Sequence, residues 1–218
     1  AVTERAKSAL IIEGVKPKKI TVIPMGIDLH RFKPSSKYKN KRDINILCVA
    51  RLVKEKGILD LLHAFLSLRR TYSHLRLTFV GSGPLYHDLY GYKNVSVKKV
   101  SYENMATEYN KADIFCLPSQ ATKTWEEQFG MSLVEAMACG LPIVATKTGA
   151  IPEVCEDLAL LAYPNNSKSL KDKLSKLITH QALRQTLGAK GRLLAEKKYN
   201  RDEVAKQIAQ IYRKVSCR

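Results

Sequence analysis

Short apolar runs alternate with amphipathic stretches through most of the chain. Ile44 to Ala50 is a largely apolar run bounded by charged residues, which is typical of a strand buried on both faces. Similar runs predict five more strands along the chain. These are Leu75–Val80, Val95–Val97, Ile114–Leu117, Pro142–Thr146 and Leu158–Ala162.

The segments between these runs place apolar residues at helical spacing. Helices are predicted at Gly57–Tyr72, from Gly81 to about Tyr90, and at Ser101–Lys111. From Ser167 onward the pattern is helical to the end of the chain. Breaks in this last region are predicted near Thr179–His180, Gly188–Gly191 and Asn200.

Strands that alternate with helices in this way are typical of a parallel sheet. The predicted fold is therefore α/β, a Rossmann-like parallel sheet of about six strands with helices on both faces. Such sheets bind ligands beyond the carboxyl ends of their strands. Residues that directly follow a predicted strand are thus the first candidates for function.

The first 43 residues have a different character. Val2–Val15 predicts a short helix that stops at Gly14, and Lys18–Pro24 predicts a strand. Arg31–Asp43 is polar and basic, which is typical of a loop or linker. The chain begins with Ala and its opening reads like an internal stretch, so we expect a segment of a longer protein.

The charge balance is strongly basic. Lys and Arg outnumber Asp and Glu by 37 to 20, for a formal net charge of +17. Such a chain attracts nucleic acid, an anionic membrane face or phosphorylated ligands, although a solvated lysine-rich surface explains the charge equally well. No nucleic-acid-binding motif occurs, so no nucleic-acid partner is expected. No apolar run approaches the about 20 residues of a membrane span.

Cysteine and histidine positions give no sign of a metal site. The five cysteines are widely spaced without a C-x-x-C pair, and the histidines show no ligand spacing. Buried free thiols in a reducing compartment are favoured over disulfides. We therefore expect neither a metal nor another cofactor.

The stretch Trp125–Gly140 combines a helix start with two carboxylates. Ser132 is predicted as an N-cap, with Glu135 at the capping-box spacing and Gly140 at the helix end. A helix start offers free N–H groups to an anion. Glu135 has a purely structural interpretation as the capping partner, and Glu127 has one as a solvated loop carboxylate.

Two cations, Arg51 and Lys56, flank the turn that follows the first sheet strand. Their side chains could hold a diphosphate, since each charged hydrogen bond contributes roughly 1.5–3 kcal/mol. They could equally be exposed cations of a very basic protein. The Gly81-Ser82-Gly83-Pro84 turn is only a weak phosphate-loop signal.

Taken as an ordered set, six segments carry a family resemblance. They are Val22–Pro34, Ala50–Gly57, Phe79–Pro84, Ala112–Ser119, Glu127–Glu135 (an E-x7-E element) and Gly149–Glu153. Together they resemble the C-terminal, donor-binding half of a retaining glycosyltransferase of family four, in glycosyltransferase group 1, which has the GT-B fold. The helices after Ser167 lack a distinctive motif.

The resemblance implies roles for the candidate residues. The catalytic residues would be Arg51 and Lys56, which would hold the donor diphosphate, and Glu127, which would hydrogen-bond sugar hydroxyls. Donor binding would fall to backbone N–H groups of Gly130, Met131, Ser132 and Leu133 and to Glu135, which would accept from the ribose hydroxyls. The base would lie near Val100 and Ser101. Members of the family typically need no metal, and no Asp-x-Asp motif occurs here.

Two departures from the family pattern are visible. The loop from Gln120 to Glu126 is longer than the usual linker, and Met25 replaces a frequent Asn. Neither carries the implied chemistry, although the loop could shift specificity for donor sugar or acceptor.

The resemblance also implies a domain plan. Residues 1–40 would be the tail of an absent N-terminal acceptor domain and the linker, 41–200 the nucleotide-sugar-binding domain, and 201–218 a helix crossing back to the absent domain. We expect sugar transfer from a nucleotide-diphosphate sugar (UDP, GDP or ADP) with retention, and an isolated chain that binds donor but turns over poorly. We expect a cytoplasmic location, with the basic surface able to contact an anionic membrane. The alternative is a non-catalytic nucleotide-sugar or polyanion-binding module.

Overall fold

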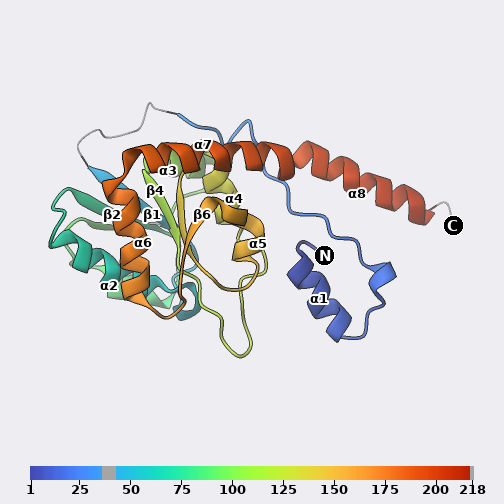
Figure 1. Ribbon diagram of the computed structural model, residues 1–218, viewed down its shortest axis with the longest axis horizontal. Coiled ribbons are helices and arrows are strands. Elements are labelled where there is room, and N and C mark those ends of the chain that lie inside the picture. The colour runs from blue at the N-terminus through green and yellow to red at the C-terminus, as the bar shows by residue number, and fades with distance from the viewer. Residues whose placement is uncertain (36–42, 217–218) are drawn as a thin grey trace.

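The computed structural model describes residues 1–35 and 43–216, and within them six parallel strands form one sheet (Figure 1). The strands are β1 (Ile44–Val49), β2 (Leu75–Val80), β3 (Val95–Lys98), β4 (Ile114–Leu117), β5 (Ile143–Thr146) and β6 (Ala159–Ala162). Their spatial order is β3-β2-β1-β4-β5-β6, the doubly wound order of dinucleotide-binding folds. The predicted fold class is confirmed.

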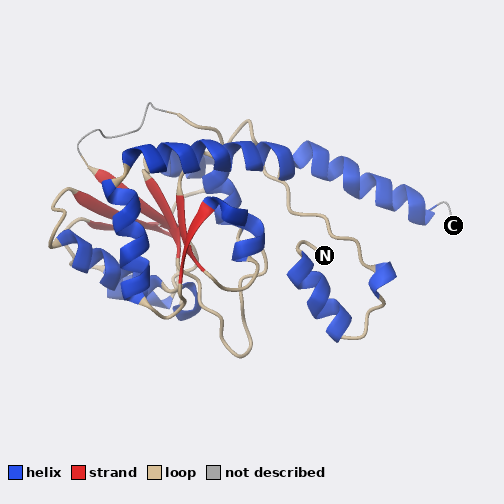
Figure 2. Ribbon diagram, in the orientation of Figure 1, coloured by secondary structure: helices blue, strands red, loops and turns tan. Residues whose placement is uncertain are grey.

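Helices cover both faces of the sheet (Figure 2). Both faces are apolar, because successive residues of β1 point to opposite sides of the sheet. Ile46 and Cys48 pack into one apolar core, and Leu47 packs into another. The first core is covered by α2 (Ile58–Arg69) and α6 (Ser167–Thr179). The second is covered by α3 (Tyr102–Asn110), α4 (Met131–Ala138), α5 (Ile151–Cys155) and α7 (Gln181–Lys198).

Strand order reverses between β1 and β4, which are neighbours in the sheet. The chain moves outward from β1 through β2 to β3, and in the other direction from β4 through β5 to β6. The loops after β1 and β4 therefore leave the sheet side by side. A Cβ on Gly57 would lie 2.0 Å from the Pro118 carbonyl oxygen, and Gln120 N donates to Glu55 O at 2.8 Å. This switch point is where such folds place ligands.

Three predicted elements are wrong. Lys18–Pro24 is not a strand: a 3₁₀ turn (Pro17–Lys19) leads into extended chain, because these residues find no sheet partner. The segment after Gly83 is a 3₁₀ helix (Pro84–Leu89) rather than an α-helix. The predicted break at Gly188–Gly191 is absent, since α7 runs through both glycines. Part of the predicted linker 31–43 lies outside the described residues.

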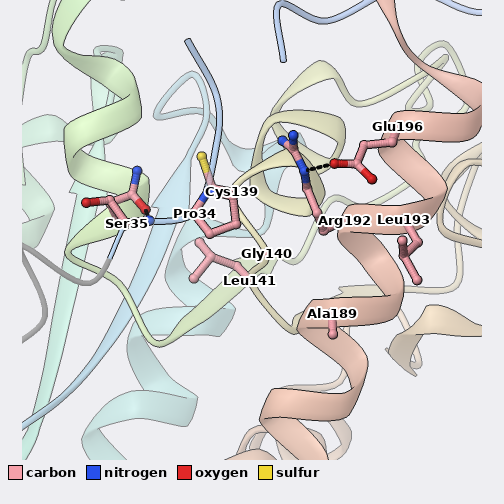
Figure 3. Close-up of a pocket in the computed structure, with 10 residues that line it drawn as sticks. Pro34, Ser35, Cys139, Gly140, Leu141, Ala189, Arg192, Leu193 and Glu196 are labelled. Atoms are coloured by element: carbon pink, nitrogen blue, oxygen red, sulfur yellow. Dashed lines mark hydrogen bonds and ion pairs between the residues drawn. The ribbon is translucent and has the colours of Figure 1, made fainter. Parts of the chain in front are cut away.

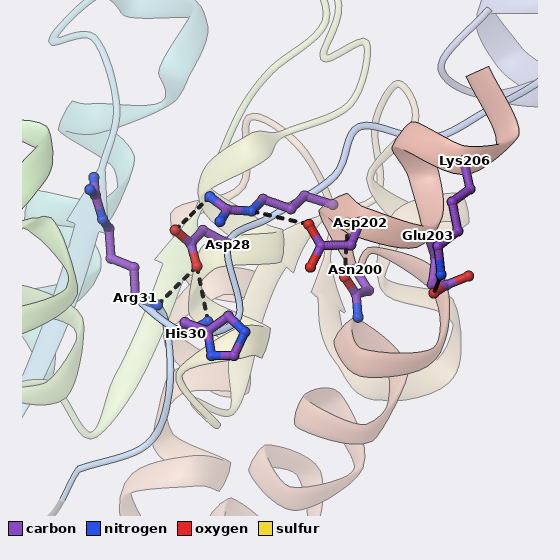
Figure 4. Close-up of polar contacts among 8 residues, drawn as sticks. Asp28, His30, Arg31, Asn200, Asp202, Glu203 and Lys206 are labelled. Atoms are coloured by element: carbon purple, nitrogen blue, oxygen red, sulfur yellow. Dashed lines mark hydrogen bonds and ion pairs between the residues drawn. The ribbon is translucent and has the colours of Figure 1, made fainter. Parts of the chain in front are cut away.

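The first 35 residues are fastened to the junction between α7 and α8 (Arg201–Ser216). Ile27 forms a parallel bridge with Asn200, and Gly26 has no room for a Cβ, which would lie 2.5 Å from Arg201 Cα. Asp28 accepts from His30 N, Arg31 N and, at 2.7 Å, Arg201 Nη1 (Figure 4). Beyond this junction α8 extends away from the sheet (Figure 1).

Candidate functional site

The centre of the site is an ion pair between the two loops at the switch point. Lys56 lies at the end of the turn after β1, and Glu127 lies in the loop between β4 and α4. Lys56 Nζ is 2.5 Å from Glu127 Oε2, and these side chains are only 13% and 10% exposed. Ser119 Oγ donates to the same carboxylate oxygen at 3.1 Å. Glu127 is therefore not a solvated loop carboxylate.

Trp125 completes the surroundings of this pair. The Lys56 ammonium lies 4.6 Å from the centre of the Trp125 ring, a cation–π distance. The loop from Gln120 to Glu126 thus lies beside the lysine.

The backbone of Glu127 is fixed by the loop between β5 and α5. Ala150 N donates to Glu127 O at 2.8 Å. A Cβ on Gly149 would lie 2.3 Å from the same oxygen, and Gly149 has φ +54°, so only glycine fits there. The segment Gly149–Glu153 therefore helps to fix the position of the Glu127 backbone.

Glu135 is a second buried carboxylate, within α4. Its side chain accepts from the Tyr109 hydroxyl at 2.6 Å and the residue is 8% exposed. Burial raises the pKa of Glu135, and the hydrogen bond from Tyr109 opposes this rise only in part. A buried acceptor with one protein donor has capacity for further donors.

The predicted capping box is wrong. The N-cap of α4 is Gly130, at φ +80°, and it makes no side-chain capping bond. Ser132 lies inside the helix, so Glu135 is left without a capping duty. Leu133 N already donates to Gly130 O at 2.8 Å, which removes one of the N–H groups expected to face a ligand. The predicted helix end is confirmed, since Gly140 N and Leu141 N donate to Met137 O and Ala136 O in a Schellman arrangement.

Arg51 is placed differently from Lys56. Its side chain is 64% exposed and its guanidinium lies 3.6 Å from Glu55, so the structure does not bring it to the Lys56–Glu127 pair. Instead it lines a pocket of about 350 Å³ at the carboxyl ends of β1 to β3, together with Gly81, Lys99, Val100 and Met105.

Lys99 and Met105 were missed by sequence reasoning. Lys99 directly follows β3 and lies two positions after the predicted strand Val95–Val97, so its place beyond a strand end is the signal that could have identified it. Met105 lies one helical turn before Tyr109 on α3, so α3 connects the pocket with Glu135.

A larger cavity of about 710 Å³ lies between the end of α4 and α7, on the side of the sheet where the strands begin (Figure 3). Pro34, Leu141 and Leu193 contribute to its mainly apolar lining. Arg192 is already used there, because it donates to Phe32 O and Ala138 O and pairs with Glu196. The cavity lacks the buried carboxylates and the strand ends of the switch point.

The cysteines were also predicted from the sequence. Cys48, Cys116, Cys139 and Cys155 are buried free thiols, as predicted, and burial raises the pKa of Cys48 and of Cys155 to about 12. Within residues 1–35 and 43–216, no cluster of three His, Cys, Asp or Glu side chains could hold a metal. No helix in that part of the chain has the length and apolarity to cross a membrane.

The family model described as glycosyl transferases group 1 matches residues 31–194. That span includes the whole switch point. The chain belongs to this family. An uncharacterised glycosyltransferase of Methanocaldococcus jannaschii is 30% identical over 187 residues, covering 81% of this chain and 50% of the relative. The chain thus spans about half the length of this relative.

Solved structures agree with the fold. The C-terminal domain of a glycosyl transferase group 1 protein from Francisella tularensis matches with a TM-score of 0.69 at 25% identity, over 80% of this chain and 99% of that one. The Anabaena protein HepE, in complex with UDP and glucose, matches with a TM-score of 0.81 at 20% identity, over 97% of this chain and 61% of that one.

Proposed function

We propose that the chain is the donor-binding half of a glycosyltransferase that moves a sugar from a nucleotide-diphosphate sugar to an acceptor with retention of configuration. The observation that carries the proposal is the nearly buried Lys56–Glu127 ion pair at the switch point of the sheet, followed in α4 by a second buried carboxylate, Glu135. The family match supports the reaction class. The bound UDP and glucose of HepE support the class of donor.

Lys56 serves the diphosphate in this proposal. As the bond between sugar and phosphate breaks, negative charge grows on the leaving diphosphate, and a fixed cation in a water-poor site stabilises it. Without donor, the Lys56 ammonium is held by Glu127 at 2.5 Å. The diphosphate therefore exchanges places with a carboxylate. Arg51, exposed and 3.6 Å from its carboxylate neighbour, reaches the same phosphates from the pocket side.

Glu127 and Glu135 serve the sugar and the ribose. Once Lys56 turns to the phosphates, the Glu127 carboxylate accepts from donor-sugar hydroxyls, and Ser119 keeps it in place. Glu135 accepts from the ribose hydroxyls while Tyr109 holds its other side. The base occupies the pocket beside Val100 and Met105. Gly130, Met131 and Ser132 present the positive end of α4 to the diphosphate.

The two cations make a metal unnecessary for diphosphate binding in this proposal. Added Mg²⁺ or EDTA should therefore leave nucleotide affinity unchanged. A tenfold gain with Mg²⁺ would contradict the metal-independent part of the proposal.

The domain plan also remains a proposal. Residues 41–200 would form the donor-binding unit, while 1–40 and 201–218 would connect to an acceptor domain beyond this chain. Exposed apolar side chains support it: Ile12 is 85% exposed on the N-terminal segment, and Tyr212 and Val215 are 71% and 67% exposed on α8. Such residues are typical of a face that another domain covers. The chain alone would bind donor without efficient transfer.

We further propose a cytoplasmic protein whose basic surface lies against an anionic membrane face. The net charge of +17 supports this, because each basic residue near such a surface contributes about 1 kcal/mol. Sedimentation with anionic vesicles, but not with neutral ones, tests it.

Calorimetric titration with UDP, GDP, ADP and their common sugars tests the central proposal. We expect one nucleotide to bind with one-to-one stoichiometry and its sugar conjugate to bind more tightly. If none of the nucleotides binds, the donor-binding role is wrong.

A further inference from the structure

The N-terminal end of α1 (Glu4–Ile12) contacts the loop that carries Glu127. Arg5 forms a two-pronged pair with the Glu126 carboxylate, with Nε to Oε1 at 2.5 Å and Nη2 to Oε2. Thr3, which is 2% exposed, donates from Oγ1 to the Gln128 carbonyl oxygen at 3.3 Å. The residues on both sides of Glu127 are thus held by the same helix start.

The helix start is itself anchored to the site. Thr3 is the N-cap of α1, and its Oγ1 accepts from Ala6 N at 3.0 Å. The Glu153 carboxylate accepts from Glu4 N at 2.7 Å and from Arg5 N at 3.2 Å, which places an anion at the positive end of α1.

Glu153 belongs to α5, whose preceding residue Ala150 holds the Glu127 carbonyl. Three consecutive residues, 126 to 128, are therefore fixed by α1 and by the loop before α5.

The Arg5–Glu126 contact serves no obvious need of the core. The Arg5 side chain is 52% exposed and Glu126 is 25% exposed, so the pair adds little to global stability. Its geometric effect is local, because a bidentate Arg–carboxylate pair fixes both distance and orientation. The carboxylate next in the chain is the one that pairs with Lys56.

We propose that Thr3 and Arg5 are positioning residues for donor binding: they fix the backbone on both sides of Glu127, and so set the affinity for the sugar part of a nucleotide sugar. The inference rests on the proposed contact between Glu127 and the donor sugar. It differs from that proposal in assigning specificity for the sugar to a segment more than 120 positions away in the sequence.

The test compares nucleotide with nucleotide sugar. UDP, GDP, UDP-glucose and GDP-mannose are titrated into the unaltered chain and into Arg5→Ala and Thr3→Val. We expect each variant to bind the nucleotide sugar about fivefold more weakly, with the affinity for the nucleotide alone unchanged. Thr3→Ser should restore much of the loss, because it keeps the hydroxyl, whereas Arg5→Lys should restore little, because a lysine keeps the charge but not the two-pronged geometry.

Two controls separate positioning from stability. Arg76→Ala removes a similar exposed pair with Asp43 at the other edge of the sheet and should leave every affinity unchanged. In a Glu127→Gln background, Arg5→Ala should have no further effect on the nucleotide sugar, because residues that act through one another are not additive.

The outcomes are distinguishable. Equal losses for nucleotide and nucleotide sugar, or a full effect of Arg5→Ala in the Glu127→Gln background, would overturn the positioning role and leave the donor-binding proposal standing. Intact sugar discrimination in both Arg5→Ala and Thr3→Val would do the same. Failure of the unaltered chain to bind any of the four ligands would overturn both.

Discussion

At the scale of single residues, the proposed function depends most on the Lys56–Glu127 pair. Both side chains are nearly buried, and removing one partner of such a pair leaves the other charge without compensation. The pair therefore keeps the site polar and ordered before a donor arrives. In the proposed function, donor binding would substitute one anion, the diphosphate, for another.

Lys56→Ala and Arg51→Ala should each lower the affinity for a nucleoside diphosphate more than that for the nucleoside. Loss of a charged hydrogen bond, at roughly 1.5–3 kcal/mol, corresponds to about tenfold or more. Calorimetric titration of both ligands measures the difference. Equal losses for the two ligands would show that these cations do not contact phosphate.

Glu135 adds a dependence on pH. Its pKa is raised above 4.5 by burial, so a proton binds the folded state more readily than the unfolded one. The stability that this provides is present below pH 4.5 and is lost as pH rises through the raised pKa. The ionised form is also the better acceptor for ribose hydroxyls.

Glu135→Gln should therefore bind nucleotide more weakly at neutral pH without any loss of thermal stability, since Gln still accepts from Tyr109. Nucleotide affinity of the unaltered chain should fall as pH drops through the raised pKa of Glu135, and that step should be absent in the variant. Titrations from pH 4.5 to 7.5 with parallel melting curves measure both. Unchanged affinity in Glu135→Gln would refute the ribose assignment.

At the scale of elements, local spacing predicted most helices and strands but not how α4 begins. Ser132 and Glu135 have the spacing of a capping box, yet Gly130 starts the helix in a left-handed conformation. The competing interaction is tertiary: Tyr109, 26 positions away, takes the Glu135 carboxylate. A pattern within a few residues cannot report a partner on another helix.

The glycines of α7 illustrate the same limit. They predict a break in an isolated helix, but here they allow α7 to pack closely on the end of α4. A Cβ on Gly188 would lie 2.2 Å from the Gly140 carbonyl oxygen, whereas one on Gly191 would find its nearest atom, Met137 Cγ, at 3.4 Å. Close packing therefore overrides helix propensity at Gly188.

Gly188→Ala should destabilise the fold by about 1–3 kcal/mol, because backbone must move to admit the methyl group. Gly191→Ala, in the same helix, has ordinary contact distance and should be neutral or gain up to about 1 kcal/mol of helix propensity. Urea denaturation of both variants measures the contrast. Equal stabilities would contradict the close packing of α7 on α4.

At the scale of the whole molecule, the parallel sheet followed from the alternation of runs, as did the search for function at the carboxyl ends of its strands. The strand order β3-β2-β1-β4-β5-β6, and with it the place of the switch point, came only from the structure. The sequence did not fully predict which candidate residues come together at the switch point. Lys56 and Glu127 do meet, but Arg51 lies toward the neighbouring pocket with Lys99. The rotamer and the ion-pair partner of a long side chain depend on which residues surround it in the folded protein. The spacing of motifs along the sequence does not give that information.

The net charge of +17 keeps open a non-catalytic polyanion-binding module, and salt separates it from a donor pocket. A polyanion that contacts six to ten basic residues loses about 10³-fold or more in affinity between 50 and 200 mM salt. A diphosphate held by two cations and a helix start should lose only about tenfold. Titrations with short duplex DNA and with nucleoside diphosphate at both salt concentrations measure this. Parallel losses for the two ligands would favour the module.

The most direct measurement is a crystal structure of the chain with a bound nucleoside diphosphate. The diphosphate should lie against Lys56 and the start of α4, with the ribose on Glu135 and the base beside Met105. The 2.5 Å contact between Lys56 and Glu127 should be replaced by one between Lys56 and phosphate. A nucleotide bound in the cavity beside Pro34, or one that leaves the Lys56–Glu127 pair intact, would contradict the assignment.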